Sequence, residues 1–336
     1  MTGWPWRPAV RGGQAAVACV GETMVSFVPS AGRGLDTTDT VGLDIAGAES
    51  NVAMYLADHG VDARWVSRLG DDAFGRRVLS RVRSAGVDVS AVALDPARPT
   101  GLLFKDPAGG STRVSYYRLG SAASALGPEA LDSGVMRTAD VWHFTGITPA
   151  LSATCLDLVS AALAGDRPCV SFDVNYRPAV WSQPPGPLLR GLAQAADIVF
   201  VGLDEAQALW GEEAREPDDV RALLPGPRIV VVKDGARAAT AFCGDSRVSV
   251  PALAVPVVEP VGAGDAFAAG FLAGLLRGEA AHRCLRLGHV TAASALAVTG
   301  DHGPLPDQPE MARLLDAPES AWPAAARPAS LSCPPS

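Results

Sequence analysis

Short apolar runs alternate with helical stretches along most of this sequence, and this order restricts the fold more than any other feature. Strands are predicted where apolar residues run together, at 15–22, 63–70, 141–146, 169–175, 197–202 and 228–235. Helices are predicted between them, including 50–61, 74–87 and 152–165. Such alternation is typical of an α/β fold, a mostly parallel sheet with helices on both faces. Ligands of these folds bind beyond the carboxyl ends of the strands.

Two segments interrupt this order, at 24–47 and 100–122. Both alternate apolar and polar residues and contain Gly and Pro turns, a pattern typical of antiparallel strands outside the main sheet. Two interpretations stay open at this point. The segments form either two surface hairpins or a small β-sheet lid over a binding site.

Composition limits the organisation and the class of partner. We predict one domain over residues 15–316, between a loose N-terminal tail (1–14) and a loose C-terminal tail (317–336), both rich in Pro. The net charge of −8 argues against nucleic-acid binding, and no run of about 18 apolar residues predicts a membrane span. Six cysteines without a CxxC pair indicate reduced thiols, so we expect a cytoplasmic protein.

A glycine-rich helix start surrounds one carboxylate, in the stretch EPVGAGDAFAAGFLAG (259–274). The first amides of such a helix have no partner inside it and, with the helix dipole, favour an anion. A carboxylate at this place suits a group that takes a proton from a hydroxyl beside a transferred phosphoryl group. From these residues alone, Asp265 is equally well explained as a favourable first-turn acid. The stretch lacks the GxxxxGK[ST] pattern of a P-loop.

Two motifs in the expected order resemble the signatures of the ribokinase-like (PfkB) carbohydrate kinases. VGAGDAFAAGF is similar to the second signature, and residues 46–75 are similar to the first; the resemblance covers about residues 15–313. It implies a ribokinase-like Rossmann-type core with a β lid. It also implies that Asp265 is the general base and that Gly262, Ala263 and Gly264 form an anion hole.

Three further stretches resemble the branch of this family that phosphorylates the linear sugar acid 2-keto-3-deoxygluconate. They are YYRLGSA (116–122), ITPALS with FDVNYRPAVW (147–152 and 172–181), and GDHGP (300–304). Arginine binds a carboxylate in a fork that lysine cannot offer, so Arg118 and Arg177 are the expected carboxylate ligands. The resemblance adds further contacts to the sugar acid from Gly47, Asn51, Tyr116 and Asp301.

For the nucleotide side, the resemblance implies ATP and magnesium. The turn after 228–232 would border ATP through Lys233 and Gly235, with Gly202, Gly264 and His289 as further nucleotide contacts. Glu205 matches an acid that organises magnesium, through water. Glu259 stands where the family usually has aspartate, which leaves a monovalent-cation site open.

Other functions remain open. A fructokinase or ribokinase would have the same fold, and a non-catalytic sugar-acid sensor would keep the fold without turnover. A nicotinamide-dependent oxidoreductase fits poorly, because no GxGxxG follows the first strand. Lid strands with open edges predict a homo-oligomer that associates through the lid. His143 is predicted to pack in the core.

Overall fold

The structure is a computed structural model that describes residue 4 and residues 6–29, 33–108 and 111–326. Within them, nine strands form one sheet in the order β13-β12-β11-β10-β9-β8-β1-β4-β5. Their bounds are β1 (Ala16–Val20), β4 (Asp62–Gly70), β5 (Val92–Asp95), β8 (Val141–Thr145), β9 (Cys169–Asp173), β10 (Ile198–Gly202), β11 (Ile229–Asp234), β12 (Ala238–Cys243) and β13 (Ser246–Pro251). All pairs from β5 to β11 are parallel, and β12 and β13 add an antiparallel edge. The mostly parallel sheet predicted from the alternation is confirmed.

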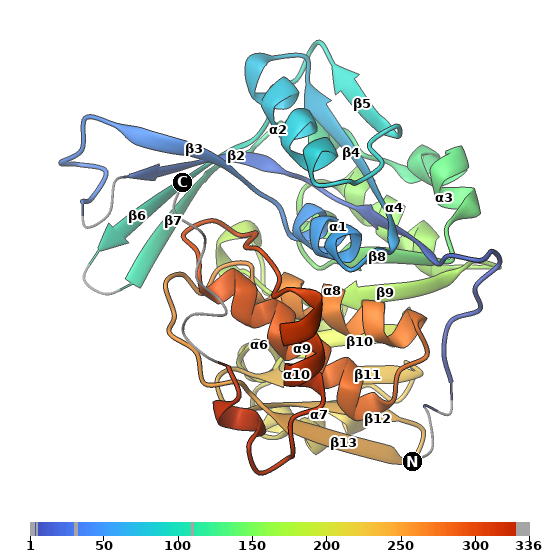
Figure 1. Ribbon diagram of the computed structural model, residues 1–336. Coiled ribbons are helices and arrows are strands. Elements are labelled where there is room, and N and C mark those ends of the chain that lie inside the picture. Colours follow the sequence, from blue (N-terminus) through green and yellow to red (C-terminus); the bar gives the residue numbers. More distant parts are fainter. Residues whose placement is uncertain (1–3, 5, 30–32, 109–110, 327–336) are drawn as a thin grey trace.

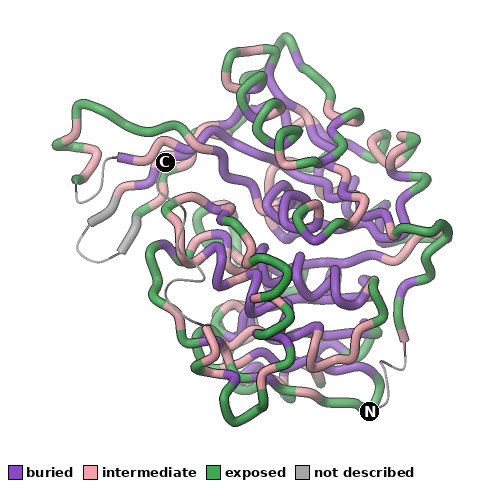
Figure 2. The backbone as a smooth tube through the Cα atoms, in the orientation of Figure 1, coloured by how far each residue is buried: buried purple, intermediate pink, exposed green. Residues whose placement is uncertain are grey.

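Helices cover both faces of this sheet, as Figure 1 shows. One face carries α1 (Ala48–Asp58), α2 (Ala73–Ser84), α8 (Ala263–Leu276), α9 (Ala281–Leu296) and α10 (Gln308–Leu315). The other carries α3 (Gly134–Thr138), α4 (Ala153–Leu163), α5 (Gly186–Ala195), α6 (Leu203–Trp210) and α7 (Pro217–Leu223). Along β10, Phe200 packs into the first core and Val201 into the second, because neighbouring strand residues point to opposite faces. Figure 2 shows that the central strands are buried, as expected of a sheet with helices on both faces.

A second sheet of four strands projects from one side of the core (Figure 1). Its order is β3-β2-β6-β7, formed by β2 (Met24–Pro29), β3 (Val41–Ala46), β6 (Leu102–Ala108) and β7 (Ser111–Tyr117). The lid segments therefore form one sheet rather than two separate hairpins. One detail of the prediction is wrong: β2 and β6 pair in parallel. The chain between them passes through the core, so it returns to the lid in the same direction.

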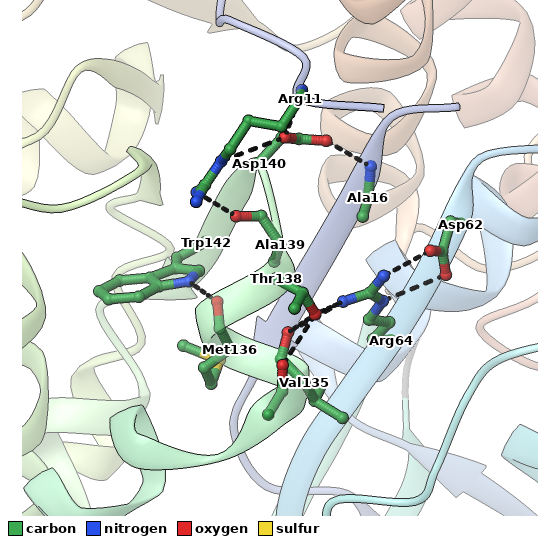
Figure 3. A network of polar contacts seen from close by, with 11 residues as sticks. Arg11, Ala16, Asp62, Arg64, Val135, Met136, Thr138, Ala139, Asp140 and Trp142 are labelled. Carbon is green, nitrogen blue, oxygen red and sulfur yellow. Dashed lines mark hydrogen bonds and ion pairs between the residues drawn. The ribbon is translucent and has the colours of Figure 1, made fainter. Parts of the chain in front are cut away.

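The described part of the N-terminal tail contacts the core, contrary to the loose segment predicted for 1–14. The indole Nε1 of Trp4 lies 3.5 Å from Cys284 Sγ, and its ring meets Phe271 edge-on at 5.9 Å. Figure 3 shows Arg11 and Ala16 held by one carboxylate: their amides donate to Asp140 over 2.9 and 3.0 Å. Large indole rings bury enough surface to order a segment whose Pro and Gly content is typical of disorder.

The C-terminal segment is ordered in the same way up to residue 326. Trp322 is almost fully buried, and its Nε1 donates to the Pro251 carbonyl over 2.7 Å. The Arg286 guanidinium lies 4.6 Å from the centre of its ring. The loose tail predicted for 317–336 is therefore wrong for the described residues, and 327–336 lie outside them. No helix in the described residues is long and apolar enough to cross a membrane.

Candidate functional site

The carboxyl ends of the central strands, the start of α8 and the lid meet around Asp265. Gly262 precedes α8 with φ of +86°, a left-handed conformation that glycine adopts without strain. A Cβ atom there would lie 2.9 Å from the carbonyl oxygen of Asp301. Having no side chain, Gly262 leaves the first amides of α8 without a side-chain cap. Ala263, Gly264 and Asp265 thus form the amide-rich helix start that the motif predicted.

Two asparagine amides hold the Asp265 carboxylate, one at each of its oxygens. Asn51 Nδ2, on α1, donates to Oδ2 over 2.9 Å. Asn175 Nδ2, two residues beyond β9, donates to Oδ1 over 3.0 Å. The side-chain oxygens of both asparagines are buried and have no hydrogen-bond partner among the described residues. A ligand hydroxyl donating to them would supply the missing partner that a buried polar atom needs.

The environment of Asp265 is suited to proton transfer near neutral pH. Burial raises the pKa of its carboxyl to about 7, and the nearby Asp173 charge adds to the rise. The hydrogen bond from Asn51 and the charges of Arg177 and Lys233 act in the opposite direction. A base works best when its pKa lies close to the working pH.

Lys233 lies beside the amide-rich helix start. Its Nζ is 2.7 Å from Asp173 Oδ2, and a Cβ at Gly264 would come within 3.3 Å of it. Burial alone would lower the pKa of Lys233, but Asp173 and Glu205 raise it, so its ammonium stays charged. A fixed cation next to a helix start without a side-chain cap is a good environment for a phosphoryl group. Gly235, predicted at the same turn, has φ of +50°.

Glu205 has both carboxylate oxygens in use. Its Oε2 accepts the amide of Gly202 over 3.0 Å, which caps α6, and its Oε1 lies 3.0 Å from an Arg177 nitrogen. Burial raises the pKa of Glu205. The described residues contain no group of three acidic, His or Cys side chains arranged for a metal ion. A magnesium site at Glu205, reached through water, stays a prediction.

The two predicted carboxylate ligands both lie near Tyr116. The Arg118 guanidinium is 5.6 Å from the centre of the Tyr116 ring, and Arg177 lies within electrostatic range of the Tyr116 hydroxyl. Arg118 already pairs with buried Glu22 at 2.5 Å, whereas its Nε has no partner among the described residues. Arg177 is 45% exposed, and one of its nitrogens donates to both Glu205 Oε1 and the Tyr176 carbonyl.

The other predicted residues divide between the site and the packing around it. Gly47 precedes α1, and a Cβ there would lie 2.5 Å from the Glu22 carbonyl oxygen. His289 is buried on α9, where it bonds the Val250 carbonyl at 3.1 Å and burial lowers its pKa to about 4. His143 packs in the core as predicted, 3.0 Å from Ser171 Oγ. A nucleotide role of His289 stays a prediction.

Sequence reasoning did not single out several residues of this network, among them Asp173, Glu22, Asn175 and Lys105. Asn175 is the one non-glycine residue with positive φ (39°) in the described part of the chain, and such a conformation persists where surrounding contacts require it. The sequence feature that could have identified Asn175 is its position just beyond the carboxyl end of a predicted strand. Lys105, on the lid strand β6, lies 2.9 Å from Asp301 Oδ1. The sequence feature that could have identified Lys105 is the scarcity of lysine, since the sequence has only two, Lys105 and Lys233.

Known proteins resemble this chain over most of its length. Residues 14–308 match the sequence profile of the "pfkB family carbohydrate kinase" family. A 2-dehydro-3-deoxygluconokinase of Thermoproteus tenax is 37% identical over 283 residues, 81% of this chain and 86% of the relative. One of Bacillus subtilis (strain 168) is 35% identical over 305 residues, 88% of this chain and 94% of the relative. The crystal structure of a PfkB protein from Polaromonas sp. JS666 is 34% identical with a TM-score of 0.76, covering 84% of this chain and 96% of that one.

Proposed function

Because this chain belongs to the pfkB family of carbohydrate kinases, we propose that it phosphorylates the terminal hydroxyl of 2-keto-3-deoxygluconate with ATP. The observation that carries the proposal is Asp265, a buried carboxylate with a pKa of about 7 at an uncapped helix start. Two arginines near Tyr116 could bind the carboxylate at the other end of a linear sugar acid. A desolvated substrate carboxylate needs such partners.

In the proposed reaction, Asp265 accepts the proton of the terminal hydroxyl as its oxygen attacks the γ-phosphorus of ATP. The new O–P bond forms while the bond from the γ-phosphorus to its bridging oxygen breaks, and ADP leaves with that electron pair. The first amides of α8 and the ammonium of Lys233 stabilise the charge on the transferred group. Asn51 and Asn175 orient the base. Magnesium, near Glu205, would neutralise phosphate charge when bound.

A coupled assay of ATP consumption tests the substrate. We expect turnover with 2-keto-3-deoxygluconate or its galacto epimer at a kcat/KM well above that for fructose or ribose. A preference for a neutral sugar would indicate a fructokinase or ribokinase instead. Binding of the sugar acid without ATP consumption would indicate a sensor. Repeating the assay with potassium replaced by choline tests the monovalent-cation site that Glu259 left open.

The raised pKa of Asp265 gives an expected pH dependence. Asp265 must be deprotonated to act as a base, so kcat/KM should rise with pH through about 7 and then level off. Asn175→Ala removes a hydrogen bond that stabilises the carboxylate, so its acid limb should move to higher pH. A pH–rate profile with the sugar acid measures both. An unmoved limb in Asn175→Ala would contradict the contact with the base.

We also propose a dimer that forms through the lid. The lid's outer strands β3 and β7 have open edges, and Val41, Leu43 and Tyr117 are exposed there. Light scattering at micromolar concentration should give a mass of twice the 34.6 kDa of one chain. Leu43→Lys should lower the measured mass toward that of a single chain. A single-chain mass for the wild type would exclude a stable dimer.

Five described cysteines have free thiols, which supports a reducing, cytoplasmic setting.

A further inference from the structure

Lys105 is a buried lysine that the proposed reaction leaves without a role. The sequence has 28 Lys and Arg residues together but only two lysines, Lys105 and Lys233, and both lie at the site. The Lys105 side chain is 3% exposed, although it extends from strand β6 of the lid. Its Nζ lies 2.9 Å from Asp301 Oδ1 and 3.5 Å from the Thr299 carbonyl. A fully desolvated ion pair thus joins the lid to the loop that follows α9.

The other oxygen of Asp301 continues this chain of contacts toward the base. Asn51 Nδ2 lies 3.4 Å from Asp301 Oδ2 and 2.9 Å from Asp265 Oδ2. An amide nitrogen carries two hydrogens, so Asn51 donates one to each carboxylate. Lys105 therefore acts on Asp301, Asp301 orients the Asn51 amide, and that amide holds Asp265. A lid residue and the proposed base are linked through two intervening side chains.

From this geometry we infer that Lys105 is a positioning residue, which keeps Asp301 ionised and thereby fixes the Asn51 amide against Asp265 when the lid is in place. The inference rests on the proposed role of Asp265 as the base. It gives the lid a part in orienting the base. Movement of β6 away from the core would remove the cation from Asp301 and loosen the hydrogen bond that orients the base.

The charges around Asp301 explain why a cation is needed there. Burial raises the pKa of Asp301, and the carboxylate of Asp44 on β3 adds to the rise. Lys105 lowers it most among the opposing groups, and the Asn51 amide lowers it further. Tyr55, on α1, also lies within electrostatic range, and its hydroxyl stays protonated because burial raises its pKa. Without Lys105, Asp301 would take up a proton more readily and accept the Asn51 hydrogen bond more weakly.

The first test is the pH–rate profile of Lys105→Met, which removes the charge and keeps an unbranched side chain. We expect kcat at pH 7 to fall roughly 10- to 100-fold, as for a displaced catalytic group, with recovery toward higher pH as Asp301 ionises. Asp301→Asn should lose activity without that recovery. The double variant should be no worse than Asp301→Asn alone, because both changes remove the same contact. Additive losses, or a Lys105→Met profile parallel to that of the wild type, would overturn the inference.

A control separates this effect from general damage to an ion pair. Arg167 pairs with Asp197 near the amino ends of β9 and β10, far along the strands from Asp265. Arg167→Met should lower the unfolding temperature while leaving kcat and its pH profile unchanged. If Arg167→Met changed the pH profile in the same way, the effect of Lys105→Met would not be specific to the site and the inference would fail.

Lysine-selective 13C and 15N labelling gives a second test that needs no turnover. Two lysines give two side-chain signals, and Lys233→Arg assigns them by elimination. We expect a Lys105 ammonium protected from hydrogen exchange in the wild type, and loss of that protection in Asp301→Asn. An unprotected or unaltered Lys105 signal would overturn the inference. A wild type that consumes no ATP with any sugar acid would instead overturn the proposed function, and the lysine signals would still test the ion pair.

Discussion

Asp265→Asn is expected to lower kcat by about 10²- to 10⁴-fold, the usual cost of losing a general base. The asparagine keeps the size of the side chain but cannot take a proton from the attacking hydroxyl. ATP binding should survive, because the amides of α8 and the Lys233 ammonium are retained. Single-turnover measurement of phosphoryl transfer and titration of ATP by calorimetry separate these two effects. The small residual rate should also lose the acid limb near pH 7 that Asp265 causes in the wild type.

A second buried carboxylate supplies the control. Asp140 is as well buried as Asp265 but lies near the amino end of β1, where it accepts the amides of Arg11 and Ala16 (Figure 3). Asp140→Asn should reduce stability and leave kcat unchanged. Near-wild-type turnover in Asp265→Asn, with an unaltered pH profile, would show that another group is the base.

The fold was predictable because its signal is local. A buried strand is a short apolar run, and each of the six predicted strands appears within two residues of its expected bounds. β5, β12 and β13 were missed, although β12 and β13 form an antiparallel hairpin around Gly244 with φ of +56°. Edge strands need less apolar sequence because one side faces no neighbour, so β13 carries Arg247 and Ser249 among its residues.

The site was predictable only where a motif placed its residues. Asp265, Asn51 and Asp301 were all predicted, and their side chains do meet. The hydrogen-bond and ion-pair partners of these side chains could not be predicted, because contacts such as Lys105 with Asp301 join residues almost 200 positions apart. One sequence contains no signal for such pairs.

The arginines show the same limit, because neither of their ion pairs was predicted, although Glu205 itself was named as a site residue. Arg118 pairs with Glu22 and Arg177 with Glu205. The two arginines now differ in a testable way. Arg118 balances a carboxylate that is only 1% exposed, so its removal should destabilise the protein by about 3–5 kcal/mol. Arg177 is the better probe of substrate binding, because it is about half exposed. Its removal leaves Glu205, which is less buried than Glu22, so the loss of stability should be smaller.

Arg177→Ala is expected to raise KM for the sugar acid by roughly ten- to a hundred-fold, the value of a charged hydrogen bond of about 1.5–3 kcal/mol. The nucleotide end of the site already has the amides of α8 and Lys233, so KM for ATP should change little. The preference for the acid over its uncharged sugar analogue should narrow, because only the acid loses a contact. Steady-state kinetics with each substrate varied in turn measure all three effects.

The ion pair with Glu205 offers a competing explanation that can be tested. Glu205 lies within electrostatic range of Lys233, so releasing it from Arg177 could disturb the phosphate end instead. Glu205→Gln frees the same arginine while leaving its guanidinium in place. It should therefore spare KM for the sugar acid, or improve it, since more donors become available to the substrate carboxylate. If Arg177→Ala and Glu205→Gln both weakened ATP and spared the sugar acid, Arg177 would belong to the nucleotide side, and the main reason for preferring a sugar acid over a neutral sugar would be lost.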